Sequence, residues 1–319
     1  MATLGELGEA AVLARIFPRL PGATATILGP GDDAAVLRAP DGRYVVTTDM
    51  MIHGPDFRLA WSTPHDLGWK AAATNLADIA AMGAVPTALV IAVAAPPGTE
   101  ITVLEGIADG LRDACDRMAP GCGVVGGDLS SSATLTIAVT AFGDLEGRDP
   151  VLRSGARPGD VLAVSGPLDL AARGLELLFE RAVDGTGAPD TARGVALRAE
   201  FPAEIEAQLA PEPPLGDGPA AALAGATAML DVSDGLAIDG RRIAAASGVR
   251  LDVSSAALES PASLTGGEAH ALLATFPPDA VLPGGFRAIG SVEPGAGLSV
   301  DGVPYGERGG WDPYVDGER

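Results

Sequence analysis

Residues 63–95 read TPHDLGWKAAATNLADIAAMGAVPTALVIAVAA, and this stretch decides the fold. Its opening Thr-Pro is typical of a helix N-cap and first helical residue, and apolar side chains then recur at helical spacing, so we expect a helix over 65–82. The apolar run over 85–95 predicts a buried strand. Asn75 and Asp78 lie three residues apart and share one face of the expected helix. A helix that leads directly into a buried strand is typical of an α/β fold.

The same interleaving of helical and strand-like patterns continues through both halves of the chain. A length of 319 residues and a hydrophobic content of 47% suit two domains with sizeable cores. Residues 143–166, GDLEGRDPVLRSGARPGDVLAVSG, are dense in Gly, Pro and Arg, which indicates a connector. We therefore expect two domains of the α/β (α+β) class, an N-terminal domain over 1–148 and a C-terminal domain over 149–319.

The charge balance argues against two classes of partner. The chain carries 42 Asp plus Glu against 21 Lys plus Arg, and its formal charge of -21 should repel nucleic acid and anionic membranes. Lys70 is the only lysine, so the Gly-Lys-Ser/Thr signature of a Walker-type phosphate loop is absent. If the protein binds ATP, metal ions must neutralise most of the phosphate charge. A general solubility role would explain the acidity equally well, but not the motifs in which many of the aspartates stand.

The sequence gives no sign of a membrane or secreted protein. Its N-terminus, MATLGELGEAAVLARIF, lacks the basic start and continuous apolar stretch of a signal peptide, and the longest apolar run, 88–95, is too short to span a bilayer. We expect a cytoplasmic protein. Cys115 and Cys122 belong to no disulfide framework and are expected to pack as small buried side chains.

Seven aspartates stand in five short motifs that contain glycine or adjoin apolar runs. They are Asp32 and Asp33 in GPGDDAAV, Asp49 in TTDMM, Asp78 in NLADIAAMGA, Asp128 in VGGDLSS, and Asp231 and Asp234 in MLDVSDGL. Carboxylates are hard oxygen ligands that suit Mg²⁺, and the small neighbouring residues leave room around them. The motifs predict a magnesium cage for a polyphosphate, with the aspartates at strand ends. Ordinary turn chemistry of Asp beside Gly is the alternative for any single motif.

The motifs resemble those of the thiamine-monophosphate kinase family, in the same order and at similar spacing over nearly the whole chain. The matching segments are GPGDDAAV, TTDMM, GWKAAATNLADIAAMGAVP, GGDLS, RSGARPGD, DVSDGL, GGE and the final GWDPY. The resemblance implies a two-domain fold like that of aminoimidazole-ribotide synthetase, with the N-terminal domain forming a sheet or barrel that spans a homodimer. It also implies direct in-line transfer of the ATP γ-phosphoryl group to thiamine monophosphate, assisted by several Mg²⁺ ions, to give thiamine diphosphate.

The resemblance also implies roles for individual residues. The implied magnesium-site residues are Asp33, Thr47, Thr48, Asp49, Asp78, Asp128 and Asp231, with Asp234 as an outer member. The residues that would contact ATP are Gly127, Asp128, Arg153 and Ser233. The substrate side would be formed by Asp56, Glu268 and Trp311. Of these residues, Asp49, Asp128 and Arg153 are the expected catalytic ones.

One segment departs from the family pattern. The family's GGEDYELLFT is replaced here by GGEAHALLATF, so Glu268 is retained while Ala269, His270 and Ala271 take the next three positions. The change leaves two alternatives to the kinase function. One is a related small-molecule kinase with a different phosphorylated acceptor, and the other is a non-catalytic paralogue that binds thiamine phosphates or nucleotide. Against the second stands the complete set of metal aspartates, because like charges in one cleft repel each other unless a cation is present.

The expected chemistry needs few special groups. An acceptor phosphate is already deprotonated near neutral pH, so no general base is required. Arg153 is the cation expected to stabilise transition-state charge, because its planar fork suits phosphate, although a solvated linker arginine is the alternative. Other enzymes of the superfamily fit less well. Neither cysteine is placed like the reactive residue of a selenophosphate synthetase, and the C-terminal tail has no cysteine like that of a hydrogenase-maturation carbamoyl dehydratase.

Overall fold

The computed structural model describes residues 2–7, 9–29 and 35–311, and it divides into two compact units. The first unit consists of Met1–Ile79, Val85–Gly147 and Leu178–Ala199. The second unit consists of Ala80–Ala84, Arg148–Leu177 and Glu200–Arg319.

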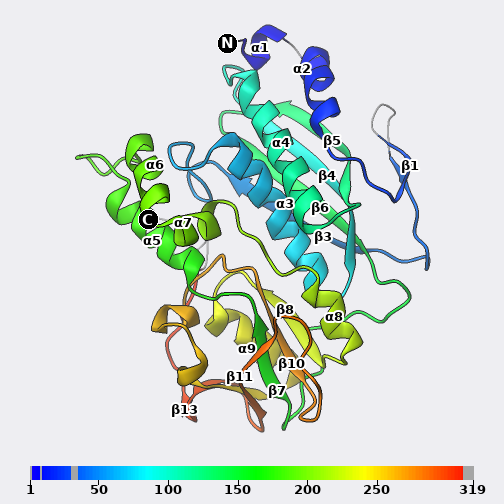
Figure 1. Cartoon of the computed structure of the whole chain (residues 1–319), viewed down its shortest axis with the longest axis vertical. Helices are drawn as coiled ribbons and strands as arrows, with labels where there is room; N and C mark the ends of the chain where they lie inside the picture. The colour runs from blue at the N-terminus through cyan, green and yellow to red at the C-terminus, as the bar shows by residue number, and fades with distance from the viewer. Residues whose placement is uncertain (1, 8, 30–34, 312–319) are drawn as a thin grey trace. The chain divides into compact units, whose positions relative to one another are not determined.

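The first unit is built on a four-stranded sheet with the order β3-β6-β4-β5. The strands are β3 (Val45–Ile52), β4 (Val85–Ala95), β5 (Gly123–Ser131) and β6 (Thr136–Asp144). β6 pairs antiparallel with β3 and β4, whereas β4 and β5 run parallel. Two long helices, α3 (Pro64–Ala81) and α4 (Ile101–Met118), lie across one face of this sheet (Figure 1). The expected helix over 65–82 and the expected strand over 85–95 are therefore confirmed.

Shorter elements complete the first unit. They are α1 (Leu4–Leu7), α2 (Glu9–Ile16), η1 (Phe17–Arg19), the two-stranded sheet of β1 (Thr26–Leu28) and β2 (Val36–Leu37), the end of α5 (Leu170–Arg181), and α6 (Thr191–Glu200). Trp61 anchors the α5 end to this unit, because its indole nitrogen donates to the carbonyl of Ala182 at 2.8 Å and its ring meets Phe179 edge-on. Arg198 of α6 makes two hydrogen bonds, of 2.8 and 3.0 Å, with the buried carboxylate of Asp66 at the start of α3.

α3 and α4 approach each other closely because glycines face the contact. A Cβ atom built on Gly68 of α3 would lie 2.0 Å from the carbonyl oxygen of Ile107, and one built on Gly110 of α4 would lie 2.0 Å from that of His65. Neither distance is possible for a real side chain, so only glycine allows the two backbones to come this close.

The second unit is built on a seven-stranded sheet with the order β13-β12-β9-β11-β7-β10-β8. Its strands are β7 (Val161–Ser165), β8 (Ala228–Val232), β9 (Arg250–Val253), β10 (Ala271–Phe276), β11 (Arg287–Glu293), β12 (Gly297–Val300) and β13 (Val303–Pro304). Its helical segments are most of α5, α7 (Pro202–Leu209), α8 (Asp217–Leu223), α9 (Leu236–Ser247), η2 (Ser255–Ala257) and η3 (Pro261–Leu264). Only the pairing of β12 with β9 is parallel among the strand pairs described in this sheet.

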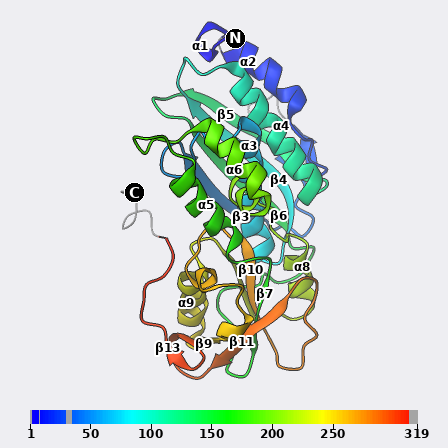
Figure 2. The same cartoon turned by 60° about the vertical axis from the view of Figure 1, so that its left-hand side comes forward.

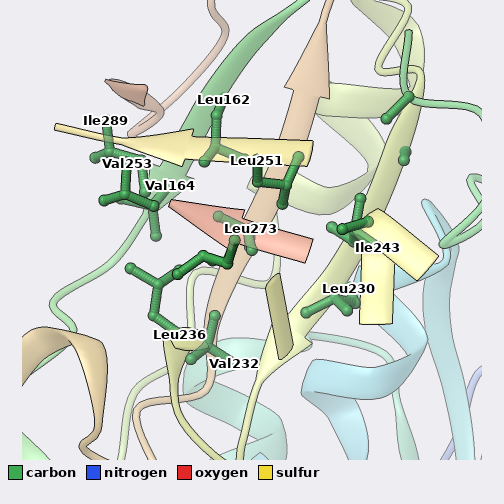
Figure 3. Packing of buried hydrophobic residues seen from close by; sticks show 14 of the residues in the cluster. Leu162, Val164, Leu230, Val232, Leu236, Ile243, Leu251, Val253, Leu273 and Ile289 are labelled. Atoms are coloured by element: carbon green, nitrogen blue, oxygen red, sulfur yellow. The ribbon is translucent and has the colours of Figure 1, made fainter. Parts of the chain in front are cut away.

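The main core of the second unit lies between this sheet and α9. Alternate strand residues point into it, including Leu230 and Val232 of β8 and Leu273 of β10, and Leu236 and Ile243 of α9 close it (Figure 3). Burial of such side chains supplies roughly 1.5–3 kcal/mol each. The core fixes the end of β8, where the aspartate motif DVSDGL begins at Asp231.

The positions of the aspartates within the strands differ from the expectation. Asp49 lies in the middle of β3 and Asp128 lies inside β5, which continues through GGDLSS to Ser131. Asp231 is the fourth residue of β8 and pairs with Leu272. The expectation that the aspartates sit at strand ends is therefore wrong for Asp49 and Asp128, whereas Asp231 does lie at the end of its strand. Polar and glycine residues read as turn signals in the sequence, but here neighbouring strands supply their backbone partners.

Two smaller expectations can also be compared with the structure. Cys115 and Cys122 are buried and do not form a disulfide. None of the helices in the described part of the chain combines the length and hydrophobicity that crossing a bilayer requires.

The glycine contact between α3 and α4 leads to a stability prediction. Gly68→Ala should lower the free energy of unfolding by about 1–3 kcal/mol, because the new methyl group meets a helix backbone that has no room to yield. Gly98→Ala is the matched control, since nothing lies within 4 Å of a Cβ atom there. Urea unfolding measures both variants, and equal stability of the two would contradict the close contact.

Candidate active site

The first candidate site lies where β3 faces α3. The hydroxyl of Thr47 donates to the Asp78 carboxylate at 2.7 Å, and the backbone N–H of Asp49 donates to the Asn75 side-chain oxygen at 3.0 Å. Because side chains alternate along a strand, Thr47 and Asp49 lie on the same face of β3, toward α3. The sheet and the helix thus bring together three of the residues assigned to magnesium from the sequence.

Asn75 holds this arrangement in place, a role that the sequence did not predict. It is 1% exposed, and its amide nitrogen donates to the carbonyl of Ala71 one turn earlier at 3.0 Å, so its oxygen is aimed at β3. β3 is an edge strand, so without Asn75 the backbone N–H of Asp49 would need another hydrogen-bond partner. The available sequence signal was that Asn75 shares one face of the expected helix with Asp78.

Thr48 and Asp128 lie on the other face of the same sheet. Register places Met50, Ala138, Ala92 and Asp128 in one row across the four strands. Asp49 belongs to the neighbouring row, and adjacent rows point to opposite faces. The structure therefore does not bring Asp128 next to Asp49 within this sheet.

Local hydrogen bonds fix both residues on that face. Thr48 donates its hydroxyl to the carbonyl of Val139 at 2.8 Å and accepts from Thr140 at 3.2 Å. Asp128 accepts from the hydroxyl of Ser130 at 2.9 Å. Both residues are exposed.

Gly127 is required by the backbone next to Asp128. A Cβ atom at this position would lie 2.0 Å from the carbonyl oxygen of Ile91 on β4. Close approach of a glycine backbone is a common means of admitting phosphate groups. An apolar cavity between β4, β5, α4 and the α2–η1 segment also borders Gly127, with Ile91, Val93 and Leu104 among its lining residues.

Three further residues assigned from the sequence lie outside these clusters. Asp33, with its neighbour Asp32, is outside the described residues. Asp56 accepts the backbone N–H of Ile52 at 2.7 Å and so closes the turn that follows β3. Arg153 is exposed, and its carbonyl accepts from the hydroxyl of Ser247 at 3.1 Å.

The second candidate site surrounds the end of β8. The backbone N–H of Glu268 donates to the carbonyl of Ser233 at 2.6 Å, and the N–H of Trp311 donates to the carbonyl of Asp234 at 2.9 Å. The second unit therefore brings together residues assigned from three sequence motifs, namely Ser233 and Asp234, Glu268, and Trp311. Glu268 has a φ of 60°, a left-handed conformation that non-glycine residues adopt at a cost.

Gln208 holds the side chain of Glu268. It lies on α7, is 3% exposed, and donates its amide to a carboxylate oxygen of Glu268. A buried amide contact of this kind fixes the direction in which the other carboxylate oxygen points. The sequence gave no signal for this pairing, because the two residues are 60 positions apart.

Asp239 organises the loop between β8 and α9. This carboxylate is 1% exposed and accepts the backbone N–H groups of Asp234 at 3.0 Å and Gly235 at 3.1 Å. Arg242 bridges Asp239 and Asp234 with contacts of 2.5 and 2.6 Å. Burial raises the pKa of Asp239 to about 6, despite the neighbouring guanidinium. Asp239 lies in the first turn of α9, where a carboxylate suits the helix dipole.

The donor set fits magnesium, although the described residues do not by themselves form a closed metal cluster. Among the described ranges, no group of three or more His, Cys, Asp or Glu side chains is placed to hold an ion. What β3 and α3 offer is the Thr47 hydroxyl bonded to the Asp78 carboxylate, with Asp49 two residues further along the same face of β3. Hard oxygen donors of this kind suit Mg²⁺, which commonly takes only one or two carboxylates and completes its shell with water and phosphate.

Comparison with known proteins identifies the family. The chain is 45% identical to a thiamine-monophosphate kinase of Mycobacterium tuberculosis over 98% of its own length and 93% of the relative. The chain belongs to the thiamine-monophosphate kinase family. It is accordingly an enzyme of that family, and the resemblance drawn from the motifs is confirmed. A thiamine-monophosphate kinase of Corynebacterium glutamicum is 41% identical over 91% of this chain and 87% of its own.

Two other comparisons support the same assignment. Residues 31–145 match the AIR synthase related protein N-terminal domain. The solved structure described as AaThiL complexed with AMPPCP and TMP has a TM-score of 0.72 and 29% identity, and it covers 97% of this chain and 98% of its own. The predicted two-domain mixed α/β fold of this family is therefore confirmed.

The buried carboxylate of Asp239 leads to a pH prediction. Because its pKa in the folded protein lies above the ordinary 3.8, its stabilising contribution is largest when it is protonated and is lost as pH rises through about 6. The stability difference between wild type and Asp239→Asn should therefore fall by about 2 kcal/mol from about pH 4.5 to 7.5. Urea unfolding at several pH values measures it.

Asp184→Asn provides a control that should stay nearly flat over this pH range. The Thr186 hydroxyl and nearby backbone N–H groups lower the pKa of Asp184 from its ordinary 3.8, so its contribution is lost only as pH falls below the range. A flat difference for Asp239→Asn across this range would show that the carboxylate is not buried as described.

Proposed function

We propose that this chain transfers the γ-phosphoryl group of ATP to thiamine monophosphate and so forms thiamine diphosphate. The observation that carries the proposal is 45% identity, over 98% of the chain, to a protein named thiamine-monophosphate kinase. The AaThiL complex with AMPPCP and TMP supports an ATP-like nucleotide and TMP as the two ligands.

We assign the magnesium-site residues as the motifs imply. They are Asp33, Thr47, Thr48, Asp49, Asp78, Asp128, Asp231 and Asp234. Bound Mg²⁺ would neutralise the charge that accumulates when two polyanions meet. Thr47, Asp49 and Asp78 would hold one part of this set, since β3 and α3 already place them together. Thr48 and Asp128 would act from the other face of the sheet.

The remaining residues bind and orient the two substrates. Gly127 lets the nucleotide phosphates approach the β5 backbone, and Ser233 and Arg153 contact the nucleotide. The apolar cavity beside Gly127 suits the base, because its lining is mostly apolar. Asp56, Glu268 and Trp311 form the thiamine side. Gln208 aims the Glu268 carboxylate, so it acts as a positioning residue.

The transfer step needs no general base. A phosphate oxygen of thiamine monophosphate attacks the γ-phosphorus in line, the bond to the bridging oxygen breaks, and ADP leaves. Arg153 contributes a planar cation to the charge on the transferring group. Positioning and charge neutralisation supply the rate enhancement.

A homodimer is part of the proposal. The face of β3 that points away from α3 exposes Val46 by 54%, Met50 by 57% and Ile52 by 36%. An apolar sheet face of this kind needs a cover, and we assign that role to the same face of a second copy. This follows the dimer-spanning sheet implied by the family resemblance, with the N-terminal domain carrying dimerisation and all of the magnesium residues except Asp231 and Asp234.

The direct test is product formation. Purified protein incubated with ATP, Mg²⁺ and thiamine monophosphate should form thiamine diphosphate and ADP in equal amounts, separated by chromatography. Metal-dependent binding of both substrates without product would identify a binding-only paralogue. Consumption of ATP with another phosphorylated acceptor, but not with thiamine monophosphate, would identify a different kinase.

Asp49 provides the sharpest variant. Asp49→Asn removes one charge with almost no change in shape, and its backbone N–H can still bond to Asn75, so turnover should fall about a hundredfold or more while the fold is kept. Asp41→Asn, at an exposed turn, is the control for loss of one carboxylate. Full activity of Asp49→Asn would contradict its assignment to the metal site.

A further inference from the structure

The imidazole of His270 is buried without a hydrogen-bond partner. The residue is 6% exposed, and among the described residues neither ring nitrogen has a hydrogen-bond partner. Its Nδ1 atom lies 3.5 Å from Oδ2 of Asp231, which is itself 7% exposed. A buried polar group without a partner is costly and calls for an explanation.

Backbone pairing at the end of β8 fixes this imidazole beside Asp231. Asp231 of β8 pairs with Leu272 of β10, and His270 directly precedes β10, two residues before Leu272. The backbone N–H of His270 donates to the carbonyl of Val232 at 2.8 Å. Its φ of 48° shows that the position is held in a conformation that costs energy.

The distance between Nδ1 of His270 and Oδ2 of Asp231 suits two ligands of one cation better than a direct hydrogen bond. A hydrogen bond between a ring nitrogen and a carboxylate oxygen is normally about 2.7–3.2 Å long. Two ligands that are each about 2.1–2.2 Å from one metal ion lie roughly 3.0–3.6 Å apart, which includes the observed 3.5 Å. The two orphan nitrogens and the buried carboxylate therefore have the arrangement of an incomplete coordination sphere.

We propose that His270 supplies a nitrogen ligand to the divalent ion held by Asp231, and that this part of the site prefers Mn²⁺ to Mg²⁺. The inference rests on the proposed function, which assigns Asp231 to the metal. Mg²⁺ prefers oxygen ligands, whereas imidazole favours the later first-row ions. The family pattern has Tyr at this position, so the nitrogen is a feature of this chain.

A histidine nitrogen bound to the metal can be assigned to His270 by substitution, because the chain has only three histidines. His65 pairs with Asp113 at 2.8 Å on the α3–α4 surface, and His53 packs its ring against Phe57. Pulsed EPR of the Mn²⁺-loaded protein should therefore show a histidine nitrogen coupling whose frequency changes when histidine is labelled with ¹⁵N. The coupling should persist in His65→Asn and His53→Asn.

His270→Asn tests the same ligand by affinity. Its Mn²⁺ affinity, measured by EPR titration, should fall about tenfold, while its Mg²⁺ affinity, measured by competition, should change less than about twofold. His65→Asn is the matched control and should keep both affinities. Absence of nitrogen coupling in the Mn²⁺-loaded wild type, or no Mn²⁺ binding at all, would overturn the proposal, and neither result depends on the folding of a variant.

The product assay separates this inference from the proposed function. Thiamine diphosphate formation without nitrogen coupling would leave the kinase intact and reject the His270 ligand. Nitrogen coupling without product under either metal would reject the proposed reaction and leave the ligand assignment standing.

Discussion

The hydrogen bonds that join the edge strand β3 to α3 are the interaction on which the first site depends. Asn75 satisfies the N–H of Asp49, and Thr47 donates to Asp78, so two hydrogen bonds hold a strand and a helix from different parts of the chain against each other. The glycine contacts between α3 and α4 fix the helix in turn, because they allow it to lie against its neighbour without side chains intervening. A shift of α3 by one turn would separate all these groups.

In the second unit, backbone hydrogen bonds between two chain segments hold the site together. The segment that carries Glu268 and His270 bonds to the end of β8, and both residues are held at positive φ. Asp239 then fixes the following loop by accepting two backbone N–H groups, with a pKa raised by its burial. The positive φ angles of Glu268 and His270 and the burial of Asp239 all lower stability, and the packed core beneath β8 offsets this cost. Figure 2 shows α9 and the strands of this unit from a second direction.

The helix expected over 65–82 and the strand expected over 85–95 agree closely with the observed elements, because apolar spacing and capping residues are local signals. The sequence misplaced Asp128, since GGDLSS reads as a turn although parallel pairing with β4 makes it strand. It could not predict that Asp49 and Asp128 face opposite sides, because that depends on strand register. The roles of Asn75, Gln208 and Asp239 also escaped it. Asn75 and Gln208 bond to residues that are distant in the sequence. The role of Asp239 depends on its burial, which is a tertiary property.

The central claim is that Thr47, Asp49 and Asp78 hold metal ions against the phosphates of a nucleotide. The most direct test is a crystal structure of the protein with Mn²⁺ and a non-hydrolysable ATP analogue, using anomalous scattering to locate the ions. The account predicts an anomalous peak within about 2.0–2.6 Å of carboxylate oxygens of Asp49 or Asp78 and within reach of a phosphate oxygen. Bound nucleotide with all anomalous peaks elsewhere would contradict it.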